Sequence, residues 1–221
     1  MVAEHDPNTS TPLSTDPSQD PEPREECGVF GVWAPGEEVS KLTYFGLFAL
    51  QHRGQEAAGI AVGDEDRIVV FKDMGLVSNV FDESILSSLH GNVAVGHTRY
   101  STAGGKEWSN VQPMFGTSPS GVDIALGHNG NLVNYLELRA EAVERGLIQP
   151  HEESVSDSMC LSMLLADGVS ENTTVFDSAL QFLPSVKGAF CLTFTDGHTL
   201  YAARDPHGVR PLSLGLSLIH I

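Results

Sequence analysis

Five short polar clusters carry most of the residue types that could do chemistry in this sequence. They combine a cysteine with histidine, arginine, asparagine and aspartate side chains, and each is bordered by glycine or opens a helix. The clusters are CGVFG at 27–31, LQHRGQEAAGI at 50–60, GHTRYSTAG at 96–104, GHNGNL at 127–132 and SVSDS at 154–158. Polar groups at strand ends and helix starts are where functional sites are usually built. Taken alone, each cluster is also typical of a turn or a helix cap.

The candidate nucleophiles are the three cysteines, Cys27, Cys160 and Cys191. An odd and sparse set does not form a disulfide framework, and no Cys-x-x-Cys pair or Cys/His cluster indicates a zinc site. Cys160 and Cys191 lie within apolar periodic segments, which is typical of buried structural thiols. Cys27 stands at an abrupt change of composition, and a buried structural thiol is an alternative role for it too. Composition does not say which of the three is a nucleophile.

In their order along the chain, these clusters resemble one family. Together with ARDPHGVRPL at 203–212, they are similar to the class II glutamine amidotransferases and, within that class, to the amidophosphoribosyltransferase family. The resemblance covers about 27–212. The glucosamine and asparagine types of class II enzyme are the neighbouring alternatives, and residues 52–57 argue against them. The resemblance implies the N-terminal-nucleophile hydrolase fold, a four-layer αββα sandwich of the α+β class.

The implied reaction, glutamine hydrolysis, is an acyl transfer and needs a nucleophile, a proton carrier and an oxyanion site. By resemblance Cys27 is the nucleophile. Its own α-amino group, with a pKa of about 7.7–8.0, suits the proton carrier. This chemistry requires that the bond between Glu26 and Cys27 is cut. Residues 1–26 are rich in Pro, Ser, Thr, Asp and Glu and lack aromatic residues. They predict a disordered leader that serves as a propeptide.

The resemblance also assigns the substrate contacts. The Asn129 side chain and the Gly130 N–H donate to the oxyanion. The guanidinium of Arg99 binds the glutamine carboxylate, helped by the Thr102 backbone, and Asp157 pairs with the ammonium group. A surface ion pair is the alternative role for Arg99, and a helix cap is the alternative for Asp157.

Three histidines in the clusters, His52, His97 and His128, also suit a catalytic base. Because the α-amine already fills that role, we expect them to be hydrogen-bonded structural residues. Arg53 is expected to order a loop near the site.

The elements that position these clusters follow from periodicity and turn residues. Strands are predicted at 27–34, 59–62, 67–72, 92–96 and 122–126, with a hairpin turning at Asp196-Gly197. Helices are predicted at 38–51, with Leu42, Phe45 and Ala49 on one face; from Leu132 to Gly146, with Leu136, Ala140 and Val143 facing inward; from Asp157, capped by Ser156; and at 175–182. Local hairpins and grouped helices favour an α+β layered sandwich.

The net charge and the hydropathy limit which classes of partner are expected. The formal net charge is −17, from 12 Lys and Arg against 29 Asp and Glu. Such a surface repels phosphate backbones, so nucleic acid is not an expected partner. No run approaches the roughly 18 apolar residues of a membrane span, and no secretory signal opens the chain. We expect a cytoplasmic protein without membrane contact.

The resemblance further implies a larger enzyme. Amidophosphoribosyltransferases use the ammonia from glutamine to make 5-phosphoribosylamine from phosphoribosyl diphosphate, in the first step of de novo purine synthesis. Nothing here matches their phosphoribosyltransferase domain, and the pattern departs from the family after Leu212. We expect residues 27–221 to be a glutaminase domain truncated at its C-terminal end, with no cofactor of its own. Mg²⁺ and an iron–sulfur cluster are expected in the missing domain, and a homo-oligomer at full length. An inactive fragment is the alternative.

Overall fold

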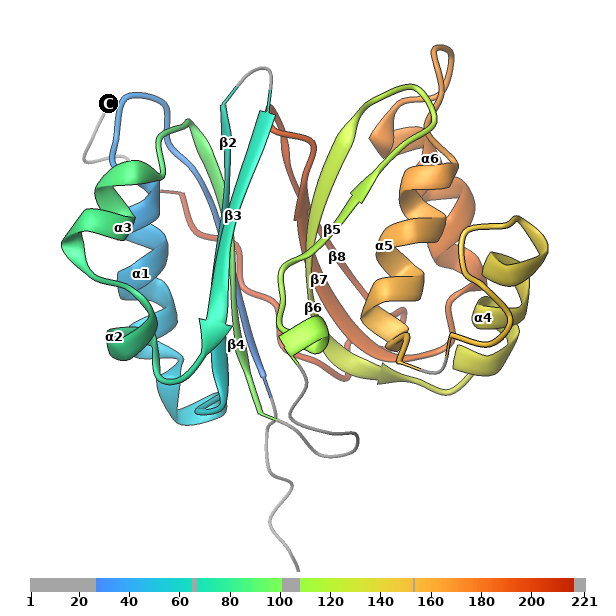
Figure 1. Cartoon of the computed structure of the whole chain (residues 1–221), viewed down its shortest axis with the longest axis horizontal. Coiled ribbons are helices and arrows are strands. Elements are labelled where there is room, and N and C mark those ends of the chain that lie inside the picture. The colour runs from blue at the N-terminus through green and yellow to red at the C-terminus, as the bar shows by residue number, and fades with distance from the viewer. Residues whose placement is uncertain (1–26, 65–66, 101–107, 153, 217–221) are drawn as a thin grey trace, which may run out of the picture.

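The computed structural model describes residues 27–64, 67–100, 108–152 and 154–216. They form two four-stranded antiparallel sheets that stack face to face, with helices covering both outer faces (Figure 1). The predicted αββα sandwich of the α+β class is therefore confirmed. The predicted leader at 1–26 lies outside the described residues.

The first sheet has the strand order β1-β4-β2-β3, and all its neighbouring strands are antiparallel. Its strands are β1 (Gly28–Trp33), β2 (Ala57–Asp64), β3 (Arg67–Met74) and β4 (Val93–Arg99). Its outer face is covered by α1 (Val39–Ala49), α2 (Val77–Val80) and α3 (Glu83–Ser88), and the 3₁₀ turn η2 (Gln51–Arg53) follows α1. This half supplies the residues on the Cys27 side of the site.

The second sheet has the order β5-β6-β7-β8 and is also antiparallel throughout. Its strands are β5 (Met114–Thr117), β6 (Asp123–Leu132), β7 (Gly188–Thr195) and β8 (Leu200–Arg204). Its helices are α4 (Tyr135–Glu144), α5 (Asp157–Asp167) and α6 (Val175–Phe182), with 3₁₀ turns η3 (Trp108–Asn110) and η4 (Leu183–Ser185). This half supplies the residues of the GHNGNL and SVSDS clusters.

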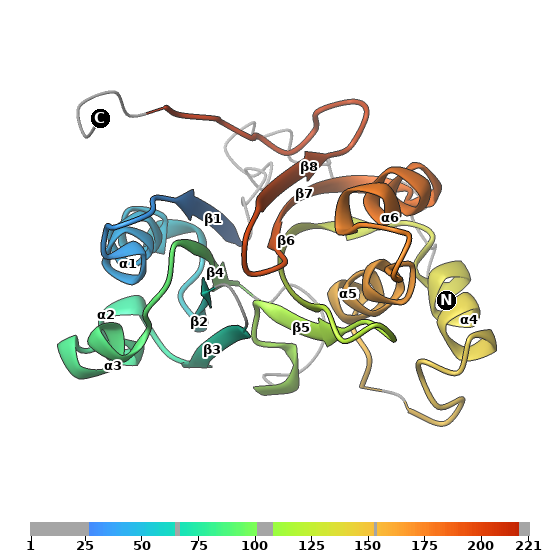
Figure 2. The same ribbon diagram turned by 90° about the horizontal axis from the view of Figure 1, so that it is seen from above.

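The apolar core is divided between the two helix layers. One cluster joins α4, α5 and α6 to β6 and β7, and the other joins α1, α2 and α3 to β2. Between the sheets, small residues such as Ala61 and Ala125 pack against each other. The view from above shows the two sheets facing each other between the helix layers (Figure 2).

Two predicted helix faces were wrong. Helix α1 buries Val39, Thr43 and Leu47, while Leu42 and Phe45 of the predicted face are exposed. The sheet beneath favours this choice, because Gly96 of β4 leaves room for the side chains of Thr43 and Leu47.

Helix α4 was also placed wrongly, because its predicted first residue belongs to a strand. Leu132 ends β6, and the helix begins at Tyr135. It buries Leu138 and Ala142, whereas Leu136 is exposed. Strand β6 runs through the whole GHNGNL cluster, which the sequence alone placed after a strand ending at residue 126. The helix at 175–182 and the hairpin about Asp196-Gly197 are confirmed.

Candidate active site

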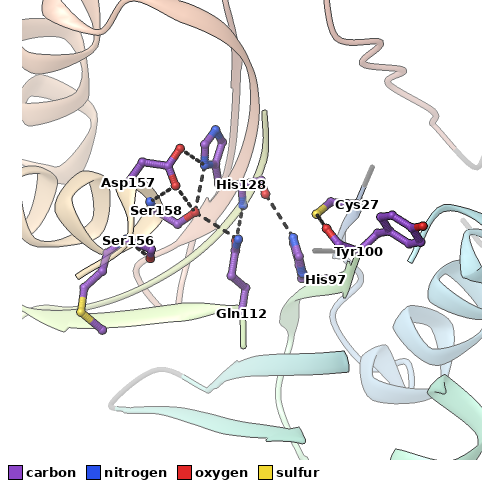
Figure 3. Close-up of polar contacts among 9 residues, drawn as sticks. Cys27, His97, Tyr100, Gln112, His128, Ser156, Asp157 and Ser158 are labelled. Atoms are coloured by element: carbon purple, nitrogen blue, oxygen red, sulfur yellow. Dashed lines mark hydrogen bonds and ion pairs between the residues drawn. The ribbon is translucent and has the colours of Figure 1, made fainter. Parts of the chain in front are cut away.

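Cys27 lies directly before β1 and is held by Arg53. The Cys27 N–H donates to the Arg53 carbonyl at 3.1 Å, and Arg53 Nε donates to the Cys27 carbonyl at 3.0 Å. The Cys27 thiol points to the carbonyl of Tyr100, with 3.6 Å between sulfur and oxygen (Figure 3). The backbone of Cys27 has φ 73°. Arg53 therefore fixes the position of the candidate nucleophile from both of its backbone groups, which is a sharper role than the loop ordering predicted.

Gly28 is required by packing around the nucleophile. A Cβ at this position would lie 2.8 Å from Thr98 Oγ1 and 3.0 Å from Leu50 Cβ. The space beside this glycine is thus filled by residues of β4 and of the turn after α1.

Arg99 ends β4, the strand that pairs with β1 on one side and β2 on the other. Its Nη1 is buried and meets no hydrogen-bond acceptor among the described residues. A buried guanidinium donor of this kind suits a ligand carboxylate better than a surface ion pair. Thr102, the other predicted carboxylate contact, lies outside the described residues.

Asn129 and Gly130 lie in β6, opposite Cys191 and Phe190 of β7. The N–H and C=O of His128 bond to two side chains on the other edge, so they point away from β7. Backbone groups alternate along an antiparallel strand, so the N–H of Gly130 points to that edge as well. The Asn129 side chain is buried, and its Oδ1 meets no donor among the described residues.

Asp157 begins helix α5 but does not cap it. Ser156 is the N-cap, as predicted, and its side chain accepts from the N–H of Met159. The Asp157 Oδ1 accepts from the N–H of Ser158 at 2.7 Å, and its Oδ2 lies 3.9 Å from His128 Nδ1. Its carboxylate is thus bound at one oxygen, by an N–H of the first helical turn, although the N-cap position itself belongs to Ser156.

The three histidines of the clusters are hydrogen-bonded in the structure. His97 and His128 are fully buried, and each is hydrogen-bonded across the sandwich or to α5. Burial lowers the pKa of His97 to about 3 and also lowers the pKa of His128. His52 is exposed and its Nδ1 contacts the carbonyl of Ala49. The prediction that these side chains are hydrogen-bonded rather than catalytic agrees with this geometry.

A chain of contacts joins the site residues across the two sheets. Cys27 reaches Tyr100, which follows Arg99; His97 of the same strand bonds to His128 in β6, and His128 bonds to Ser158 beside Asp157 (Figure 3). Since Arg53 of the cluster at 50–60 is bonded to Cys27, the structure brings residues of all five clusters to one end of the interface between the sheets.

Comparison with known proteins agrees with this arrangement. A profile of the glutamine amidotransferase domain family matches residues 97–218, which is more than half of the chain. The chain belongs to the glutamine amidotransferase family.

This glutamine amidotransferase domain is similar to part of several amidophosphoribosyltransferases. Amidophosphoribosyltransferases of Mycobacterium leprae and Mycobacterium tuberculosis are 62% and 60% identical to it over 195 residues, which is 87% of this chain but 35% and 37% of theirs. The glutamine phosphoribosylpyrophosphate amidotransferase of Bacillus subtilis, solved with ADP and GMP, superposes with a TM-score of 0.75 at 38% identity, covering 86% of this chain and 40% of that one. The domain therefore spans somewhat over a third of the length of these relatives.

Two groups in this glutamine amidotransferase domain escaped sequence reasoning. Gln112 and Ser158 are buried and bonded to His128. Gln112 lies in none of the five clusters, and Ser158 lies in SVSDS but was given no role. Gln112 is a polar residue between Val111 and Pro113. Because a buried amide without a hydrogen-bond partner is costly, this position was a signal that the Gln112 side chain has a specific partner.

The other cysteines are structural, as predicted. Cys160 and Cys191 are buried in α5 and β7. Burial raises the pKa of Cys160 to about 11 and also raises the pKa of Cys191. Across the described ranges, no three His, Cys, Asp or Glu side chains are grouped to hold a metal ion, and no helix has the length and apolar character of a membrane span.

Proposed function

We propose that this chain hydrolyses glutamine to glutamate and ammonia with Cys27 as nucleophile, once residues 1–26 have been removed. The observation that carries the proposal is the position of Cys27. Arg53 holds it, and His97 links its sheet to the strand that bears Asn129 and Gly130. An acyl transfer needs a nucleophile and an oxyanion site that face each other, and the proposal gives these roles to Cys27 and to Asn129 with Gly130.

The proposed reaction starts with proton transfer from the thiol to the free α-amine of Cys27. In the uncleaved chain, the amide nitrogen of Cys27 lies 3.1 Å from the Arg53 carbonyl. After cleavage this nitrogen would be the α-amine, and the Arg53 carbonyl would accept a hydrogen bond from it. The sulfur attacks the amide carbon of glutamine, and the oxyanion accepts from Asn129 Nδ2 and the Gly130 N–H. The ammonium form of the amine then returns its proton to the leaving nitrogen, and ammonia departs. Water hydrolyses the thioester to glutamate.

The proposed substrate contacts follow from charge and burial. Arg99, with its buried Nη1, binds the glutamine carboxylate with the Thr102 backbone. Asp157 accepts the substrate ammonium at the carboxylate oxygen that Ser158 does not occupy. A buried donor and a half-bound carboxylate are the polar groups that a zwitterionic amino acid would satisfy.

We further propose that the ammonia serves a phosphoribosyltransferase domain, so that the longer protein makes 5-phosphoribosylamine from phosphoribosyl diphosphate in purine synthesis. The identity to mycobacterial amidophosphoribosyltransferases, over about a third of their length, supports this assignment. The longer protein is proposed to be a cytoplasmic homo-oligomer, with Mg²⁺ and an iron–sulfur cluster held outside this chain.

The test is glutamine hydrolysis by the chain translated from a Met-Cys27 start, whose initiator methionine is removed in the host. Ammonia release is expected from this form and not from its Cys27→Ala variant. Adding phosphoribosyl diphosphate and Mg²⁺ should yield no phosphoribosylamine. Hydrolysis that persists in Cys27→Ala contradicts the proposal. So does full activity in a chain whose intact mass still includes residues 1–26.

A further inference from the structure

Strand β6 loses one of its neighbours just before the proposed oxyanion donors. Strand β5 pairs with it only from Asp123 to Leu126, whereas β7 continues alongside to Leu132. Beyond Leu126, every second residue of β6 therefore turns its N–H and C=O toward an edge without a strand. Backbone groups that are buried in this way need other partners.

Two side chains replace the missing strand at His128. The N–H of His128 donates to Gln112 Oε1 at 2.7 Å, and its C=O accepts from His97 Nε2 at 3.1 Å. A carbonyl only accepts, so His97 carries its proton on Nε2. Gln112 stands two residues before β5 begins, and His97 comes from the facing sheet. The peptide groups next to Asn129 are thus held from both halves of the sandwich.

The same amide reaches the carboxylate proposed to bind the substrate ammonium. Gln112 Nε2 donates to Ser158 Oγ at 3.1 Å, and Ser158 Oγ lies 2.9 Å from His128 Nδ1 and 3.3 Å from Asp157 Oδ1. A hydroxyl has one proton and two lone pairs. The three contacts of the hydroxyl are compatible when Ser158 accepts from Gln112 and His128 and donates to Asp157 (Figure 3).

We propose that Gln112, His97 and Ser158 are positioning residues that couple the oxyanion site to substrate capture. Gln112 and His97 fix the backbone of His128, and so the direction of the Asn129 side chain and the Gly130 N–H. Ser158 orients the Asp157 carboxylate. The inference rests on the proposed glutaminase function. It assigns one kinetic effect to the oxyanion arm, Gln112 and His97, and another to the capture arm, Ser158.

The arms predict different changes in kcat and KM. Gln112→Met keeps the length of the side chain but removes both polar groups, so kcat should fall about 10- to 100-fold, part of the effect of losing an oxyanion donor. Ser158→Ala removes the hydroxyl donor to Asp157, so KM for glutamine should rise several-fold. It also removes the acceptor for Gln112 Nε2, but Gln112 Oε1 still accepts from the N–H of His128, so kcat should fall much less than in Gln112→Met. His97→Gln keeps a donor near the place of Nε2 and should retain much more kcat than His97→Leu.

The matched control is Ser178→Ala. Ser178 is as buried as Ser158 and also lies in a helix of the outer layer, but its Oγ donates to the carbonyl of Leu165. This variant should lower the melting temperature and leave kcat and KM unchanged. Alkylation of Cys27 by iodoacetamide should proceed at a similar rate in every folded variant, because the nucleophile is held by Arg53 and not by this network.

Three results would overturn the inference while leaving the glutaminase function intact. They are a kcat of Gln112→Met within twofold of the parent, a KM of Ser158→Ala equal to that of Ser178→Ala, and no advantage of His97→Gln over His97→Leu. If Gln112→Met does not fold, the Ser158 and His97 comparisons decide alone. Failure of the proposed function is recognised separately, by an inactive parent or an active Cys27→Ala chain.

Discussion

Replacing Gly130 by alanine should separate the oxyanion site from the rest of the fold. A Cβ at Gly130 would lie 2.1 Å from the carbonyl oxygen of Ala189 and 2.7 Å from Phe190 Cα, both backbone atoms of β7. Ordinary contact begins at 3.4 Å, so β6 has to move away from β7 by about 1 Å. A misplacement of that size costs on the order of 10²-fold in rate when it affects groups aligned with the reacting atoms.

The matched control is Gly127→Ala in the same strand. Its Cβ would meet Thr193 Oγ1 at 3.2 Å and two valine methyl groups at 3.5 Å, which small adjustments accommodate. Ammonia release and thermal unfolding should be measured for both variants. Gly130→Ala should lose about 10²-fold or more in kcat and about 1–3 kcal/mol of stability, while Gly127→Ala loses little of either. Equal kcat values for the two variants would refute the placement of the oxyanion donors.

Three further outcomes are expected. Arg99→Lys should raise KM for glutamine about 10- to 100-fold with little change in kcat, because an ammonium group cannot reproduce the fork; equal losses in kcat and in stability would show a structural role instead. Cys160→Ala and Cys191→Ala should each cost about 1 kcal/mol of unfolding free energy and leave ammonia release unchanged, which denaturant titration and the glutaminase assay check together. Burial lowers the pKa of His97 from 6.5 to about 3, so the unfolded chain takes up a proton that the native chain does not. The free energy of unfolding therefore carries no His97 penalty above pH 6.5 and decreases as pH falls from 6.5 toward 3. In His97→Gln this loss should disappear, so the slope of unfolding free energy against pH should be smaller by up to about 1.4 kcal/mol per pH unit.

The fold class and the main site clusters were accessible from the sequence because they depend on local signals. The hairpin about Asp196-Gly197 and the Ser156 cap are set by short-range chemistry, and both were found. The face of α1 was not, because Leu42 and Phe45 share a helical stripe as regular as the buried one. Only the shape of the sheet below, with Gly96 under Thr43 and Leu47, selects between them.

Residues that act through tertiary contacts were also beyond the sequence. Gln112 bonds to His128 because β5 begins opposite Leu126 and leaves the edge of β6 beyond it without a strand, which depends on strand register. Ser158 sits in a cluster that was recognised, but its partner His128 lies 30 residues earlier in the chain. No local pattern records such pairings.

The left-handed backbone at Cys27 gives the leader a thermodynamic meaning. A cysteine at φ 73° is in a region that L residues avoid, at a cost of roughly 1–3 kcal/mol. This torsion is defined by the carbonyl carbon of the preceding residue, so it ceases to exist when the bond to residue 26 is cut. Under the proposed cleavage, this strain would belong to the uncleaved chain alone and would be released when the leader is removed. The mature chain should melt at a higher temperature than a form that keeps the leader, and an equal or lower melting temperature would show that the precursor is unstrained.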